Sequence, residues 1–146
     1  MYQVSEITVS YKPRFKISDR PIIRDSRTIV KILREFWGDD INLYESVNII
    51  LLNNANHVLG FSRITTGTID SSIVDIYKIL QIALTAHANG IILAHNHPSG
   101  NLSPSNADLK MTKALDEAAK LMKIRFLDHI ILTENSYTSF KDECLM

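Results

Sequence analysis

The 146-residue sequence predicts a mixed α/β fold with three layers, in which a mixed β-sheet lies between helices. Short apolar runs rich in isoleucine, leucine and valine predict interior strands, and apolar residues spaced three or four apart predict amphipathic helices. Along the chain these segments follow the order β, α, β, β, α, β, α, β, β, which combines one hairpin with helical crossovers. We therefore expect helices on both faces of the sheet and a ligand site at the ends of its strands.

The N-terminal residues predict an extended arm that does not fold by itself. Residues 2–11 alternate loosely between apolar and polar side chains, which is consistent with a strand, and Pro13 and Pro21 favour extended backbone. We therefore divide the chain into a basic arm, residues 1–25, and a folded domain, residues 26–146. The arm is expected to pack on the domain or on a second copy of the chain, which would make a homodimer.

Turn and capping residues separate the elements of the domain. Asp25-Ser26 can cap a helix that Gly38 stops, and the asparagine-rich stretch 53–56 predicts a turn between two antiparallel strands. The expected elements are a helix ending before Gly38, strands over 45–52 and 58–67, a helix capped by 71–75 and ending near 88, a strand from Gly90, a helix from 106, a strand over 125–132 and an edge strand over 137–140.

The stretch from Ala94 to Asp108, with the sequence AHNHPSGNLSPSNAD, predicts a strand end, a loop and the first turn of a helix. His95 and His97 stand two residues apart on extended backbone, so their imidazoles project from one side of the sheet while Asn96 projects from the other. The prolines and the glycine that follow prevent the strand from continuing. Two imidazoles on the same side can converge on one metal ion.

Ser105 and Asp108 stand three residues apart at the start of the next helix. This spacing is typical of a capping box, and it also brings the Asp108 carboxylate near the strand that carries the two histidines. Two neutral imidazoles and one carboxylate suit zinc with a fourth position open to water, as in catalytic sites. The simpler alternatives are a capping-box acid at Asp108 and two histidines that are merely buried.

These residues resemble the JAMM motif of the MPN (JAB-type) metalloprotease domain. The bacterial RadC branch is the most similar, and the resemblance spans roughly Ser26 to the C-terminus. It implies an MPN/JAB-like fold, with a layout related to that of cytidine deaminase, and a zinc-dependent hydrolase acting on peptide or isopeptide bonds. The residues that carry the resemblance are His95, His97, Ser105 and Asp108, together with the runs HNHPSG (95–100) and LDH (127–129).

A hydrolytic site of this kind also needs a base that does not bind the metal. Glu45 is the candidate because it opens an otherwise apolar strand, and the resemblance implies a catalytic glutamate at this point; Glu35, in a helix, is the fallback. Ser105 can cap its helix or donate a hydrogen bond to an oxyanion, and the resemblance favours the second role. His129 is expected to be structural or to orient a ligand.

Composition and charge limit the alternatives. The formal net charge is zero, although residues 1–36 carry eight basic and four acidic side chains, which leaves binding to nucleic acid or to an acidic partner open. With Cys144 as the single cysteine, there is no internal disulfide and no Pro-Cys-x-x-Cys pair of a zinc nucleobase deaminase. A non-catalytic accessory protein of DNA repair or mobile elements remains the second hypothesis.

The same sequence carries no sign of a membrane protein. No apolar run approaches the roughly 18 residues that a bilayer requires, and the first residues lack the pattern of a signal peptide. A cytoplasmic location is therefore expected.

Overall fold

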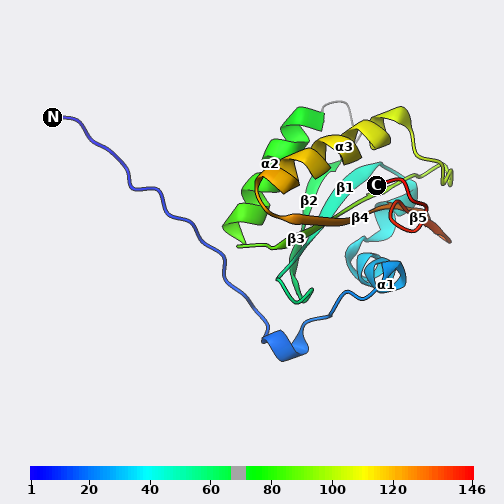
Figure 1. Ribbon diagram of the computed structural model, residues 1–146, viewed down its shortest axis with the longest axis horizontal. Coiled ribbons are helices and arrows are strands. Elements are labelled where there is room, and N and C mark those ends of the chain that lie inside the picture. The colour runs from blue at the N-terminus through cyan, green and yellow to red at the C-terminus, as the bar shows by residue number, and fades with distance from the viewer. Residues whose placement is uncertain (67–71) are drawn as a thin grey trace.

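The computed structural model describes residues 1–66 and 72–146, with side chains given for all of these except 72–75. Within these residues the strands form one five-stranded mixed sheet in the order β2-β1-β3-β4-β5. Helices α2 and α3 cover one face of the sheet and α1 covers the other (Figure 1). The predicted mixed α/β fold with three layers is confirmed.

Strand pairing follows the apolar runs of the sequence. β1 pairs antiparallel with β2 on one side and with β3 on the other, whereas β3 and β4 are parallel and β5 is antiparallel to β4. The fully buried strands β1 and β3 lie at the centre of the sheet. The strands are β1 (Ser46–Leu52), β2 (Val58–Thr66), β3 (Gly90–Asn96), β4 (Arg125–Leu132) and β5 (Tyr137–Ser139).

The helices begin and end where the sequence indicates. Asp25 caps α1, because its carboxylate accepts a hydrogen bond of 2.8 Å from the backbone N–H of Thr28. Gly38, with φ of +92°, then takes a backbone conformation that side chains disfavour and ends the segment. Of the expected capping segment 71–75, residue 71 lies outside the described residues and residues 72–75 belong to α2. The helices are α1 (Ser26–Phe36), α2 (Ser72–Thr85) and α3 (Asn106–Leu121), with 3-10 turns η1 (Ile17–Asp19) and η2 (Asp39–Asn42).

The sheet separates two apolar cores, and side-chain alternation decides which core each strand residue enters. In β3, Ile91 and Leu93 belong to the core beneath α2 and α3, while Ile92 and Ala94 belong to the core beneath α1. By the same alternation His95 faces the α2 and α3 side, and the following Asn96 faces the α1 side. The last two residues of β3 therefore project their side chains to opposite faces of the sheet.

The strand expected over residues 2–11 is wrong. Residues 1–14 form no helix or strand, and the side chains of Tyr2, Val4 and Ile7 are each more than 90% exposed. Apolar alternation cannot create a strand without a neighbouring strand to supply backbone partners, and this segment runs away from the domain (Figure 1). The arm contacts the domain at Tyr11, whose hydroxyl donates to the Leu59 carbonyl at 2.8 Å.

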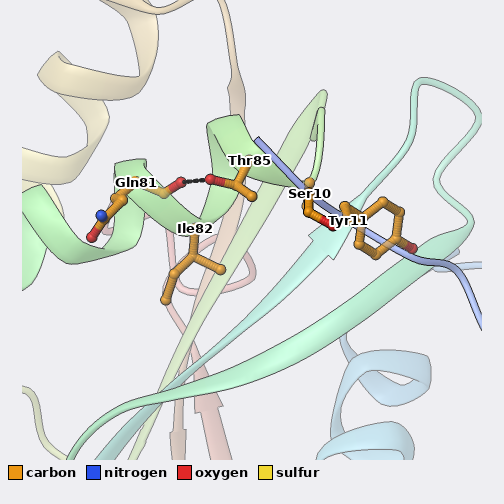
Figure 2. A pocket seen from close by; sticks show the side chains of 6 residues that line it. Ser10, Tyr11, Gln81, Ile82 and Thr85 are labelled. Carbon is orange, nitrogen blue, oxygen red and sulfur yellow. Dashed lines mark hydrogen bonds between the residues drawn. The ribbon is translucent and has the colours of Figure 1, made fainter. Parts of the chain in front are cut away.

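A cavity of about 320 Å³ lies where the arm passes α2 (Figure 2). The residues that line it are Ser10, Tyr11, Gln81, Ile82, Thr85 and Ala86. None of the histidines or carboxylates that the sequence marks as candidate ligands is among them, so the cavity belongs to the junction between arm and domain. Among the described residues, no helix is both long enough and apolar enough to cross a membrane.

Leu33 tests the packing of α1 on the sheet. Its side chain is fully buried in the α1 core, so Leu33→Ala should lower the free energy of unfolding by about 2–5 kcal/mol through lost burial and a residual cavity. Leu121→Ala is the matched control, because that side chain is 79% exposed and should cost roughly 0.5 kcal/mol or less. Chemical denaturation of both variants measures the difference; equal losses would contradict the packing described.

Candidate metal centre

The end of β3 and the first turn of α3 bring three side chains together. The Nε2 atoms of His95 and His97 lie 2.9 Å apart, and the Asp108 carboxylate approaches the first at 3.1 Å and the second at 3.3 Å. His95 and Asp108 are buried, and the His97 side chain is 11% exposed. The two imidazoles and the carboxylate predicted from the sequence therefore converge at one point.

The loop between β3 and α3 explains why they converge. The His97 N–H still bonds the Leu132 carbonyl of β4 at 3.0 Å, and a turn follows in which the Gly100 N–H bonds the His97 carbonyl. Gly100 has φ of +82°, a conformation that glycine adopts without strain. The chain thus reverses within a few residues and returns the start of α3 to the end of β3.

Ser105 and Asp108 form a capping box at the start of α3. The Ser105 hydroxyl accepts from the Asp108 N–H at 3.1 Å, and one Asp108 carboxylate oxygen accepts from the Ser105 N–H at 2.8 Å. These bonds fix the rotation of the Asp108 side chain. The capping role and the ligand role are therefore compatible, because the cap holds the carboxylate where it meets both imidazoles.

A directed chain of hydrogen bonds fixes the tautomer of His95. The Thr112 hydroxyl donates to the Asp108 backbone carbonyl at 2.8 Å, so at 2.6 Å it must accept from His129 Nδ1–H. His129 Nε2 is then an acceptor and takes the Nδ1–H of His95 at 2.7 Å. The Nε2 atom of His95 is left with its lone pair pointing at the cluster.

His97 is fixed in the same tautomer by a separate contact. Its Nδ1 lies 2.6 Å from the backbone carbonyl of Asn101, which can only accept, so Nδ1 carries the proton. The Nε2 lone pairs of both histidines consequently point into the space beside the Asp108 carboxylate. Such outer contacts commonly orient histidine ligands in metal sites.

The donor set and its spacing fit a divalent metal ion. Tetrahedral zinc with ligand distances of about 2.0–2.2 Å places its donor atoms about 3.3–3.5 Å apart, close to the 2.9–3.3 Å found here. Two lone pairs and a carboxylate directed at one another repel unless a cation lies between them. His95, His97 and Asp108 could therefore hold a metal ion, and among the described residues they are the group of three that meets this requirement.

The charge states agree with this arrangement. Burial alone would raise the pKa of the Asp108 carboxyl, but the adjacent rings of His95 and His97 and the Ser105 backbone N–H lower it well below its usual range, so the group is ionised. The Asp108 carboxylate beside its Nε2 raises the pKa of His97 against the effect of burial. Complete burial lowers the pKa of His129 well below its usual value, in keeping with the neutral tautomer.

Residues 139–141, near the C-terminus, help to fix the position of His129. Its ring stacks on Phe140 with centroids 4.3 Å apart. Asp128 accepts from the backbone N–H groups of His129 and Lys141 and from the Ser139 hydroxyl, which ties β4 to β5 and the turn after it. His129 thus contacts the candidate ligand His95 and lies outside the group of candidate ligands, as the sequence predicted.

Glu45 lies at the same end of the sheet. It directly precedes β1, whose antiparallel register pairs Val47 with His95; continued by two residues, back from Val47 and on from His95, this register would set Glu45 opposite His97. Its side chain is half-buried, and its carboxylate is one of the charges that raise the pKa of His97. Glu35, the fallback, is exposed on α1.

Sequence reasoning missed Thr112 and Asn101. Thr112 lies one helical turn after Asp108 on the same face of α3, so the spacing of four was a usable signal for a polar partner. Asn101 contributes a backbone carbonyl, which carries no side-chain signature. The contact depends on the loop conformation alone.

Comparison with known proteins identifies the family. A protein-family model, that of the RadC-like JAB domain, matches residues 23–145, which is most of the chain. The chain belongs to the RadC-like JAB domain family. Among its RadC-like relatives are proteins named UPF0758 from Flavobacterium johnsoniae, 41% identical over 68% of this chain, and from Haemophilus influenzae, 35% identical over 98%.

A third relative, a UPF0758 protein from Chlorobaculum tepidum, is 39% identical over 85% of this chain. These alignments cover 44%, 63% and 55% of the Flavobacterium, Haemophilus and Chlorobaculum proteins respectively. The chain therefore spans about half the length of the curated relatives it matches.

Thr112→Val tests the hydrogen-bond chain behind His95. The variant keeps the shape of the side chain but removes the acceptor for His129 Nδ1–H, so zinc affinity should fall about 10- to 100-fold. Thr85→Val is the matched control, because Thr85 makes the same hydroxyl-to-carbonyl bond within α2 and lies at the cavity beside the arm (Figure 2). Competition with a chromophoric chelator measures both; equal affinities for the two variants would refute the chain.

Proposed function

We propose that this domain is a zinc-dependent hydrolase of the JAMM type that cleaves a peptide or isopeptide bond. One observation carries the proposal: two imidazoles locked with their Nε2 lone pairs directed at a shared point, beside an ionised carboxylate. A structural histidine pair would need no such common direction. Three protein ligands also leave one coordination position of zinc open, as a hydrolytic site requires.

His95, His97 and Asp108 would hold the metal, and zinc bound there would lower the pKa of a coordinated water and polarise the substrate carbonyl. Glu45 is proposed to take the proton of the attacking water as the new C–O bond forms. It then returns that proton to the nitrogen as the C–N bond breaks. Its place opposite His97 and its half-buried side chain support this role.

Ser105 is proposed to stabilise the charge that develops on the carbonyl oxygen. Its hydroxyl oxygen already accepts from the Asp108 N–H, which leaves the hydroxyl proton available to donate. A donor directed at a developing oxyanion commonly accounts for a 100- to 1,000-fold rate effect, as ~2.7–4 kcal/mol of stabilisation. The capping box would then hold both the metal ligand and the oxyanion donor.

Two considerations favour an amide over a phosphodiester as the substrate. Membership of the RadC-like JAB family points to the peptidase chemistry of the JAMM motif. Nucleases and phosphatases commonly use two metal ions about 4 Å apart, whereas the ligand group found among the described residues suits one. The peptide or protein that the full-length relatives act on is part of the proposal.

A non-catalytic role in DNA repair or mobile elements is the alternative. The observation in its favour is the basic arm, on which Lys12, Arg14 and Lys16 are exposed. An accessory protein of that kind would bind duplex DNA with a steep dependence on salt. It would give no reason for a carboxylate at position 45 to stand opposite a histidine ligand.

Two substitutions separate metal binding from catalysis. His97→Ala should lose stoichiometric zinc, while Glu45→Gln should keep zinc and lose about 100-fold or more in kcat because the base is gone. The measurements are zinc content and cleavage of a fluorogenic peptide panel. Glu117→Gln is the control for the carboxylate, since this residue is exposed on α3.

His87→Asn is the control for the histidine. His87 is exposed and has φ of +55°, a conformation that asparagine tolerates. Wild-type protein that holds one zinc and cleaves no peptide would overturn the proposed function. So would a Glu45→Gln variant as active as wild type.

A further inference from the structure

Asn96 is a fully buried polar residue between the two histidine ligands. As the last residue of β3 it follows the alternation of the strand, so its side chain faces the α1 side of the sheet, away from the metal centre. A buried amide that met no partner would cost a few kcal/mol. Its contacts therefore show what the residue does there.

The Asn96 amide uses both its oxygen and its nitrogen. The oxygen accepts from the Ser46 backbone N–H at 2.7 Å and from the Ser46 hydroxyl at 3.3 Å. The nitrogen donates to the backbone carbonyls of Ile41 at 2.6 Å and Tyr44 at 2.7 Å. A flipped amide would set its NH2 group against the Ser46 N–H and its oxygen against two carbonyls, so one orientation alone satisfies every group.

Two of these partners, in Tyr44 and Ser46, flank Glu45 along the chain. The Tyr44 carbonyl belongs to the peptide group before the Glu45 Cα, and the Ser46 N–H belongs to the peptide group after it. Both peptide planes that adjoin Glu45 are thus bonded to one rigid amide. The backbone dihedrals of Glu45 are fixed, and its side-chain torsions are the freedom that remains.

Other contacts hold the segment that contains Glu45, residues 43–45, only weakly. It joins the 3-10 turn η2 to β1, and Leu43 and Tyr44 have side chains 67% and 57% exposed, so they contribute little packing. Two backbone bonds, from the N–H groups of Leu43 and Tyr44 to the Asp40 carbonyl, continue the turn before Glu45. Among the described residues, the Asn96 amide joins the segment to β3, the strand that contains His95 and leads into His97.

We propose that Asn96 is a positioning residue that sets the Glu45 carboxylate at the metal centre. This inference rests on the proposed function, because it assumes that Glu45 is the base. Three consecutive residues at the end of β3 then have separate roles: His95 and His97 direct ligand atoms to one face of the sheet, and Asn96 holds the base from the other face. Since the backbone of Glu45 and the two histidines are tied to the same strand end, the distance between their backbones is fixed by covalent geometry and four hydrogen bonds.

The structural part is tested without any substrate. Asn96→Ala removes all four bonds, and Asn96→Asp keeps the shape and the acceptor but loses the donors. Hydrogen exchange of the Ser46 amide, read by NMR, should accelerate about tenfold in Asn96→Ala. Asn48→Ala is the matched control: Asn48 is a buried asparagine of β1 whose amide nitrogen has no hydrogen-bond partner among the described residues, and its loss should leave Ser46 exchange unchanged.

The catalytic part is tested on zinc-loaded protein with the peptide that wild type cleaves fastest. Both Asn96 variants should keep zinc and KM while kcat falls about 10- to 100-fold, as expected for a displaced base. In the Glu45→Gln background Asn96→Asp should cost nothing further, because a residue that acts through Glu45 has no effect once the base is absent. A residue that only stabilises the fold would cost the same in both backgrounds.

The outcomes separate the two proposals. Unchanged Ser46 exchange in Asn96→Ala, or a full additional loss of kcat in the double variant, would overturn the positioning role while the hydrolase remains. Zinc-loaded wild type that cleaves no peptide would overturn the proposed function and the catalytic part with it, and Ser46 exchange would still decide whether Asn96 holds the segment. If Asn96→Ala does not fold, the near-isosteric Asn96→Asp decides the catalytic part.

Discussion

The direction of one buried hydrogen-bond chain sets the orientation of His95 in the candidate metal centre. It starts at the Asp108 backbone carbonyl and passes through Thr112 and His129 to His95. Because the carbonyl can only accept, the donor and the acceptor of each following bond are determined. Reversing any bond would place two donors or two acceptors against each other in the buried interior, which would destabilise the fold by a few kcal/mol. The chain therefore determines which nitrogen of His95 is free to bind. Because it begins on the residue that supplies the carboxylate, α3 and β4 fix two ligands together.

The fold places this chemistry where strand β3 ends and α3 begins. Two apolar cores hold the sheet from both sides, so the end of β3 is rigid and its side chains have fixed directions. The His95 side is enclosed by α3 and by the C-terminal segment, through the stacking of Phe140 on His129. The Asn96 side is occupied by the segment that leads into β1. The end of β3 therefore contacts elements on both faces of the sheet.

Local patterns in the sequence predicted most of the fold and the three residues that could hold a metal ion. Apolar runs and caps gave the strands and helices, and His95, His97 and Asp108 were identified because strand alternation and a capping box act over a few residues. Alternation failed in the arm, since it does not reveal whether a partner strand exists. The bonds of Asn96 to residues 41–46 span about 50 positions, and only the folded sheet brings them together. The catalytic roles of Glu45 and Ser105 stay predictions.

The central claim is that His95 Nε2, His97 Nε2 and the Asp108 carboxylate bind one metal ion. A crystal structure of the zinc-loaded chain, with anomalous data on both sides of the zinc absorption edge, tests this most directly. The account predicts a zinc peak about 2.0–2.2 Å from these three groups, with His129 still bonded to Nδ1 of His95. A peak held by other residues, by either Nδ1 atom, or no peak between the three side chains would contradict it.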